Sequence, residues 1–175
     1  MSPPTWEGVI TLTNDTRTIV KMLSDHELAL KELYQTYAAK IPSLEDFWLR
    51  LAADEQRHSD WLGLLMSKPG VDDSSDPCCW PRPAAVESSL KYIRAQIVRA
   101  KQGEVTLLVA LSIAKDLESA LLEKEFFRVA DSASPEARAV LGRLVLATEK
   151  HGRAVVKALE AAKCAPPNPK PAECA

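Results

Sequence analysis

Glycine and alternating β-branched residues are both scarce in this sequence, which has only 6 glycines among its 175 residues. Sheet proteins rely on such turns and alternations, so the scarcity argues against a sheet fold. No apolar run reaches the length of a membrane span. The first residues, MSPPTWEGV, lack the basic and apolar regions of an export signal. We therefore expect a cytoplasmic protein with no membrane partner.

The sequence also lacks a large excess of one charge, because it has 22 Lys and Arg residues and 24 Asp and Glu residues. Without a basic excess we expect no nucleic-acid partner. The four cysteines include no CxxC pair, which leaves a thiolate zinc or iron site unsupported. Cys78 and Cys79 are adjacent in a Pro-flanked segment, and we interpret them as reduced thiols.

Stretches rich in Ala, Leu, Glu, Lys and Arg predict an all-α protein. The predicted helices cover about 14–40, 43–66, 86–102, 104–130 and 135–162, and the last begins with Pro135 at its first position. Residues 1–13 are expected to form an extended lead, 14–162 one helical bundle, and 163–175 a disordered Pro-rich tail. Ser24 and Glu27 also fit a capping box, which would start the first helix later.

The predicted helices form two hairpins joined by one long crossover, which begins with a Pro-, Ser- and Asp-rich linker at 67–85. The crossover carries an extra short helix. This connectivity predicts a four-helix bundle with one long crossover connection.

Several polar residues lie on the apolar stripes of these helices, where the core is expected. They are Glu27, Glu55, His58, Glu118 and His151, and they come from four different helices. Buried carboxylates are costly to desolvate and repel one another, so protons, a basic partner or a metal ion must compensate. Glu55 and His58 share a helix face, and their carboxylate and imidazole groups suit iron, manganese or zinc.

From residue 14 to 162 the sequence resembles the ferritin-like superfamily, and within it the rubrerythrin-like di-iron carboxylate proteins. In that family two helices each supply a Glu and two others each supply an ExxH pair. Glu27 in SDHELALKELYQTYA and Glu118 in AKDLESALLEKEFF match the two single Glu ligands. Glu55 and His58 in DEQRH match the first ExxH pair, and His151 in LATEKHGRAV matches the second His.

The resemblance also implies a neighbouring group around these ligands. Tyr34 follows Glu27 by one heptad and is expected to hydrogen-bond a ligating carboxylate. Thr148 stands where the second ExxH pair should have its Glu. Glu149 is adjacent but rotated by about 100° around the helix, and Glu125 is another carboxylate of the stripe. The second metal position is therefore weak, completed by water or Glu149, or absent. No rubredoxin-like cysteine module is present.

Each of these residues also has an alternative interpretation in which no metal is bound. Glu55 and His58 can form a buried hydrogen-bonded pair, and Glu118 can pair with Lys115 on its own helix. His151 can be an ordinary core histidine. Tyr34 and Tyr37 are interpreted first as core residues and His26 as exposed. Trp48 and Trp61 are interpreted as exposed aromatics that either serve a dimer contact or pack under the crossover segment.

The resemblance implies a non-haem protein that binds one or two iron ions, with manganese or zinc as alternatives. It implies redox chemistry with peroxide or dioxygen and a homodimer, whereas enzyme activity itself stays open. The alternative is a binding or scaffold module that keeps the bundle with a degraded metal site, as the missing Glu suggests. A substrate hydroxylase would additionally need an apolar access pocket beside the metal.

Overall fold

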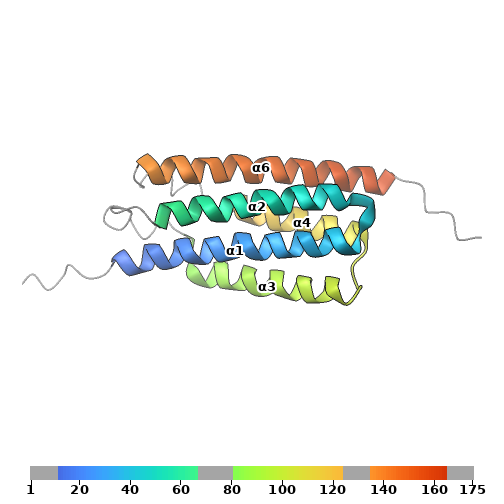
Figure 1. Ribbon diagram of the computed structural model, residues 1–175, viewed down its shortest axis with the longest axis horizontal. Coiled ribbons are helices and arrows are strands. Elements are labelled where there is room, and N and C mark those ends of the chain that lie inside the picture. Colours follow the sequence, from blue (N-terminus) through green and yellow to red (C-terminus); the bar gives the residue numbers. More distant parts are fainter. Residues whose placement is uncertain (1–11, 67–80, 124–134, 165–175) are drawn as a thin grey trace, which may run out of the picture.

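The computed structural model describes residues 12–66, 81–123 and 135–164, with side chains described over 17–66, 81–120 and 138–164. These residues form helices and connecting turns with no strand, which confirms the all-α prediction. The elements are α1 (Leu12–Lys40), the 3-10 turn η1 (Pro42–Leu44), α2 (Glu45–Met66), α3 (Pro83–Lys101), α4 (Leu107–Glu123) and α6 (Pro135–Cys164). The α-helices lie along one common axis as a bundle (Figure 1).

The helix ends follow from local sequence chemistry. After α1 the Ile41 amide donates a hydrogen bond to the Tyr37 carbonyl at 2.8 Å, and Pro42 then starts η1. α3 ends one residue before Gln102, and Gly103 at φ +81° turns the chain toward α4. α6 begins at Pro135, as expected. Helical structure thus extends two residues beyond each end of the predicted 14–162 bundle.

The helices pack in the pairs that the two-hairpin prediction requires. α1 packs against α2, α4 packs against α6, and α2 packs against α6 to join the two hairpins. The crossover helix α3 has 19 residues and packs along α1. It is shorter than α1, α2 and α6, which have 29, 22 and 30 residues, as the prediction of a shorter crossover helix requires.

The interior consists of two apolar clusters with a polar layer between them. The larger cluster contains Leu30, Tyr34 and Trp48, together with residues of α3, α4 and α6. The smaller one contains Val20 and Leu62. Along α1 and α2, all buried polar residues except Thr36 fall between the parts of each helix that feed the two clusters; they are Ser24, His26, Glu27, Glu55, His58 and Ser59.

The leading prediction that α1 starts near residue 14 is confirmed, whereas the alternative start at Ser24 and the exposure of His26 were wrong. The helix continues through Ser24 rather than starting there, and the Ser24 hydroxyl lies 2.9 Å from the Ser59 hydroxyl of α2. His26 is buried, with Nε2 2.9 Å from the Ser89 hydroxyl, because α3 covers this side of α1. Because α1 packs against both α2 and α3, its buried face is wider than contact with α2 alone would make it.

The aromatic residues of α2 also differ from expectation. Trp48 is fully buried, because it packs against Tyr34, Tyr37 and Phe47 inside the larger cluster. Trp61 is only half-buried. The prediction of an exposed aromatic was thus wrong for Trp48.

Some sequence predictions concern segments outside the described residues. They are residues 1–11 of the lead, 67–80 of the linker, Cys78, Cys79, Glu125 and residues 165–175 of the tail. Among the helices described, none combines the length and the apolar character needed to cross a membrane.

Candidate metal centre

The five predicted ligands meet in the polar layer at the middle of the bundle. They come from α1 (Glu27), α2 (Glu55 and His58), α4 (Glu118) and α6 (His151), and each is at most 4% exposed. The three-residue spacing of Glu55 and His58 places both on the face of α2 that looks inward. The register of each apolar stripe therefore predicted which polar residues lie in the core.

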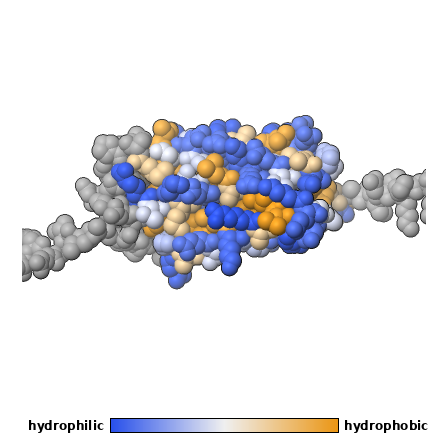
Figure 2. Space-filling view, turned by 60° about the horizontal axis from the view of Figure 1, so that its bottom comes forward, coloured by the Kyte–Doolittle hydropathy of each residue, from blue (hydrophilic) through white to orange (hydrophobic). Residues whose placement is uncertain are grey.

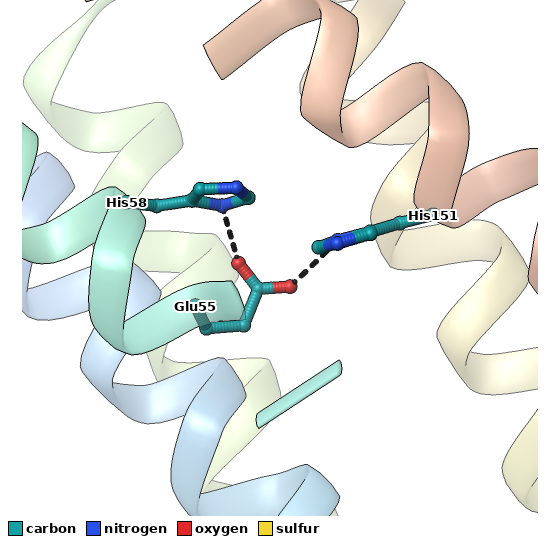
Figure 3. A group of neighbouring side chains, drawn as sticks. All are labelled: Glu55, His58 and His151. Atoms are coloured by element: carbon teal, nitrogen blue, oxygen red, sulfur yellow. Dashed lines mark ion pairs between the residues drawn. The ribbon is translucent and has the colours of Figure 1, made fainter. Parts of the chain in front are cut away.

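Glu55 is the centre of the group (Figure 3). Its Oε2 atom lies 2.7 Å from His58 Nδ1, and its Oε1 atom lies 3.1 Å from His151 Nδ1. The two imidazole rings stack with centroids 5.2 Å apart at 26°. One carboxylate thus presents an oxygen to each of two histidines from different hairpins.

A second carboxylate accompanies each histidine. Glu27 Oε2 lies 3.3 Å from His58 Nδ1, and Glu118 Oε1 lies 3.7 Å from His151 Nδ1. The Tyr34 hydroxyl donates a hydrogen bond of 2.7 Å to Glu118 Oε1, as the resemblance implies. The cluster therefore has two halves, each with one histidine and one glutamate, around the shared Glu55.

Protons hold this cluster together when no ion is bound. Burial lowers the pKa of both histidines, but the carboxylates outweigh it and raise the pKa of His58 to about 9 and of His151 to about 10. Burial raises the pKa of Glu27 to about 7, against the attraction of His58. Burial also opposes ionisation of Glu55, yet the two histidines bring its pKa below its ordinary value.

Two buried polar atoms of the cluster lie close to a charged partner but do not form a well-aligned hydrogen bond. Although Glu55 Oε1 and His151 Nδ1 attract each other across 3.1 Å, neither atom has an aligned hydrogen-bond partner among the described residues. Buried polar atoms without partners are rare and are often explained by an ion or by a functional role. These two atoms face each other in Figure 3.

The donor set fits a metal ion. Glu55, His58 and His151 each offer a ligand atom, and these atoms lie within 4.8 Å of one another. One carboxylate oxygen and two imidazole nitrogens suit iron, manganese or zinc. This buried group can hold a metal ion, with Glu27 and Glu118 at its two edges.

Sequence reasoning missed one residue of the site. Asp54 Oδ2 lies 3.0 Å from His151 Nε2, and the same carboxylate pairs with Arg57 on the surface of α2. A carboxylate on the outer nitrogen fixes the tautomer and leaves Nδ1 free to bind a metal. Asp54 lies beside the stripe of α2 and not on it, so periodicity gave no signal for it.

The position at which the resemblance implies a sixth ligand holds a small side chain. Thr148 is buried in the polar layer. Glu149 does not replace it, because its carboxylate pairs with Arg153 at 3.5 Å on the outer side of α6. The alternative pair between Lys115 and Glu118 is also not formed, since Lys115 lies 3.9 Å from Asp116 and Glu118 is buried.

A surface groove of about 450 Å³ runs between α4 and α6. It is lined by Ser119, Glu149, Gly152, Arg153, Val156 and Lys157. Glu118 and His151 are each followed in sequence by a lining residue, but they do not line the groove themselves. The groove nevertheless borders the cluster, because a Cβ atom at Gly152 would lie 3.9 Å from Glu118 Cβ.

The fold and site together define a helical bundle with a buried carboxylate–histidine cluster. Comparison of the chain with protein-family models, with curated proteins and with solved structures gave no match. The functional argument therefore rests on the geometry of the cluster.

Proposed function

We propose that this protein is a non-haem iron protein of the ferritin-like, rubrerythrin-like type. The observation that carries the proposal is the position of Glu55, whose two oxygens face the Nδ1 atoms of His58 and His151. A carboxylate between two histidines from different helix pairs is suited to bridge two ions, or to hold one ion with both rings. The four-helix origin of the ligands supports the same proposal.

The charges of the cluster support binding of divalent ions. Glu27 and Glu118 add a second carboxylate to each half, so three carboxylates face one or two ions. Three negative charges neutralise most of the four positive charges on two divalent ions. Manganese and zinc suit the same donors, and iron is proposed because of the family resemblance.

Bound iron supplies one-electron exchange between its ferrous and ferric states, with peroxide or dioxygen as the proposed oxidant. The residues of the chain hold and shape the site. The carboxylates of Glu27, Glu55 and Glu118 offset the charge, while Asp54 orients the His151 ring. Tyr34 fixes one oxygen of Glu118 by its hydrogen bond. Burial of all five ligands excludes bulk water.

A metal-free scaffold is the second candidate function, and two observations favour it. Thr148 leaves the ligand set one carboxylate short of the family pattern. The histidines and carboxylates also pair with one another, so that protons can compensate the buried charges without a metal. In this case the bundle would serve as a binding module.

Metal analysis after anaerobic loading with Fe(II) separates the two candidates. We expect one or two irons per chain in the wild-type protein and a loss of iron in Glu55→Gln, which keeps the size of the side chain. Glu149→Gln is the matched control, because Glu149 is a surface carboxylate on α6, and it should keep its iron.

Each outcome has a defined meaning. Two irons would show that Thr148 does not prevent a dinuclear site, and one would indicate a mononuclear site. A folded wild-type protein that takes up no iron would overturn the proposal and favour the scaffold. A homodimer is also proposed, and a mass in solution of one 19.2 kDa chain would contradict it.

A further inference from the structure

The groove between α4 and α6 has the dimensions of a small-molecule site. Its volume is about 450 Å³, and sites for small ligands generally have volumes of about 300–1,000 Å³. Ser119 of α4 forms one wall, and the other wall is the stretch of α6 from Glu149 to Lys157. The groove is a hollow of the surface, so a ligand can enter it without a rearrangement of the bundle.

Gly152 lines the groove at the point where the groove borders the carboxylate–histidine cluster. A Cβ atom at this position would lie 3.9 Å from Glu118 Cβ, which is an ordinary van der Waals distance. Gly152 also lacks the positive φ that would favour glycine, and glycine stabilises a helix less than alanine does. Packing of α4 on α6 therefore does not require glycine here. The space that the missing side chain leaves belongs to the groove.

Two cationic side chains lie on the α6 wall of the groove. Arg153 and Lys157 are four residues apart, so they leave the same face of α6. Glu149 pairs with Arg153 at 3.5 Å, but both side chains are in contact with water, where such a pair contributes little. Lys157 has no ion pair among the described residues. Two cations and one carboxylate favour a ligand with one negative charge, because Glu149 would repel a second one.

An apolar surface for the rest of a ligand lies beside these charges. Val156 lines the groove and is 41% exposed. Exposure alone does not mark a site, because Val98 of α3 is 53% exposed. Figure 2 shows the face over α3, where apolar residues lie among a mostly hydrophilic surface. Val156 differs from Val98 because it lies in a groove with two cations, where the apolar and the charged part of one ligand can both be bound.

We propose that the groove between α4 and α6 binds a small monocarboxylate with a short apolar chain. The carboxylate pairs with Lys157 and Arg153, and the chain lies against Val156 and in the space beside Gly152. Ser119 offers a hydroxyl group from the opposite wall. None of the five residues of the carboxylate–histidine cluster lines the groove, so the site does not depend on a bound metal.

Titration of the full-length, metal-free protein with butyrate tests the proposal, and amide NMR chemical shifts measure the binding. We expect saturable shifts at Ser119 and along residues 149–157, and weaker binding of butyramide, which has nearly the same shape without the charge. Shifts that do not saturate, or that spread evenly over basic residues elsewhere, would overturn the proposal. Tighter binding of inorganic phosphate than of butyrate would overturn the assigned class of ligand.

Removal of either cation should weaken the binding of butyrate. We expect Arg153→Gln and Lys157→Gln each to raise the dissociation constant by about two- to fivefold, the contribution of an exposed ion pair, and the double variant to bind no butyrate measurably. Arg143→Gln is the matched control, since Arg143 is an exposed arginine of α6 that does not line the groove. Equal dissociation constants for the double variant and the control would contradict the proposed carboxylate contacts.

Filling the groove should abolish binding without a change of charge. Gly152→Leu places a side chain in the groove, whereas Gly142→Leu is the control, because Gly142 lies in α6 outside the groove and a Cβ atom there would meet nothing within 4 Å. Gly152→Ala should weaken binding, and it serves as the test if the larger side chain prevents folding, which circular dichroism detects.

A folded Gly152→Leu protein that binds butyrate as tightly as Gly142→Leu would overturn the proposal. The same holds for Gly152→Ala with unchanged affinity where the leucine variant does not fold. Because no metal is present in these titrations, their results are independent of iron uptake, whose failure overturns only the proposed function.

Discussion

At the scale of single residues, the two ring nitrogens of His151 have different roles, because each faces a different carboxylate. Nε2 faces Asp54 at 3.0 Å, and Nδ1 faces Glu55 at 3.1 Å. The outer carboxylate fixes the ring, so that the inner nitrogen can serve as a ligand. The pair between Asp54 and Arg57 in turn limits the positions that the Asp54 side chain can take.

We predict that Asp54→Asn weakens metal binding by about 10- to 100-fold, because an outer carboxylate holds a ligating histidine in its orientation and raises its basicity. Titration of Fe(II) under anaerobic conditions measures the change. Asp60→Asn is the matched control, since Asp60 is an exposed carboxylate of α2 that accepts a hydrogen bond from Gln56. An affinity of Asp54→Asn equal to that of the control would contradict the role of Asp54.

The pKa shifts predict how the stability of the metal-free protein depends on pH. The pKa values of His58 and His151 rise from an ordinary 6.5 to about 9 and about 10, so the folded state binds protons more tightly than the unfolded state. Their contribution to stability is complete below pH 6.5 and is lost as the pH rises through 9 to 10. The raised pKa of Glu27 acts in the same direction between 4.5 and about 7.

Thermal unfolding of the metal-free protein should therefore show a falling midpoint between pH 6 and pH 9, measured by circular dichroism. His151→Gln should flatten the slope, because one of the two histidines that take up protons is gone. A midpoint that is constant or rising over this range would be incompatible with protonated histidines in the folded cluster.

At the scale of elements, periodicity predicted the helices well because most of them have two distinct faces. The stripe of α2 placed Glu55 and His58 in the core, and the stripe of α6 did the same for His151. The residues of the carboxylate–histidine cluster were thus predictable from their register on each helix. Asp54 was not, because a residue beside the stripe reaches the site only through the length of its side chain.

The remaining differences come from packing between helices. Sequence patterns do not show which helix a crossover segment will cover, so the burial of His26 by α3 could not be foreseen. The burial of Trp48 has a different origin, because its contacts with Tyr34 and Tyr37 depend on how α1 and α2 pair. These features depend on packing between elements and not on any single helix.

We predict that α3 is an integral part of the core. Ile93 is fully buried in the larger cluster, so Ile93→Ala should lower the free energy of unfolding by about 2–5 kcal/mol. Val98 is 53% exposed on the same helix, and Val98→Ala should change it by no more than about 0.5 kcal/mol. Urea denaturation measures both, and equal effects would contradict the packing of α3 against α1.

At the scale of the whole molecule, two apolar clusters hold the helices together on either side of one polar layer. Such a layer is expensive unless its charges are compensated, either by protons or by an ion. The same five residues serve both states, since the histidines carry protons in the metal-free protein and must release them to bind a metal. Metal binding and proton release are therefore coupled in this bundle.

The most direct test is the number of protons released when Fe(II) binds at pH 7 without oxygen, measured by calorimetry in buffers of different ionisation enthalpy. His58 and His151 both have pKa values above 7 in the metal-free cluster, so we predict release of at least two protons per chain when both become ligands. Binding of iron with no proton release would place the ion away from these histidines and contradict the proposed metal centre.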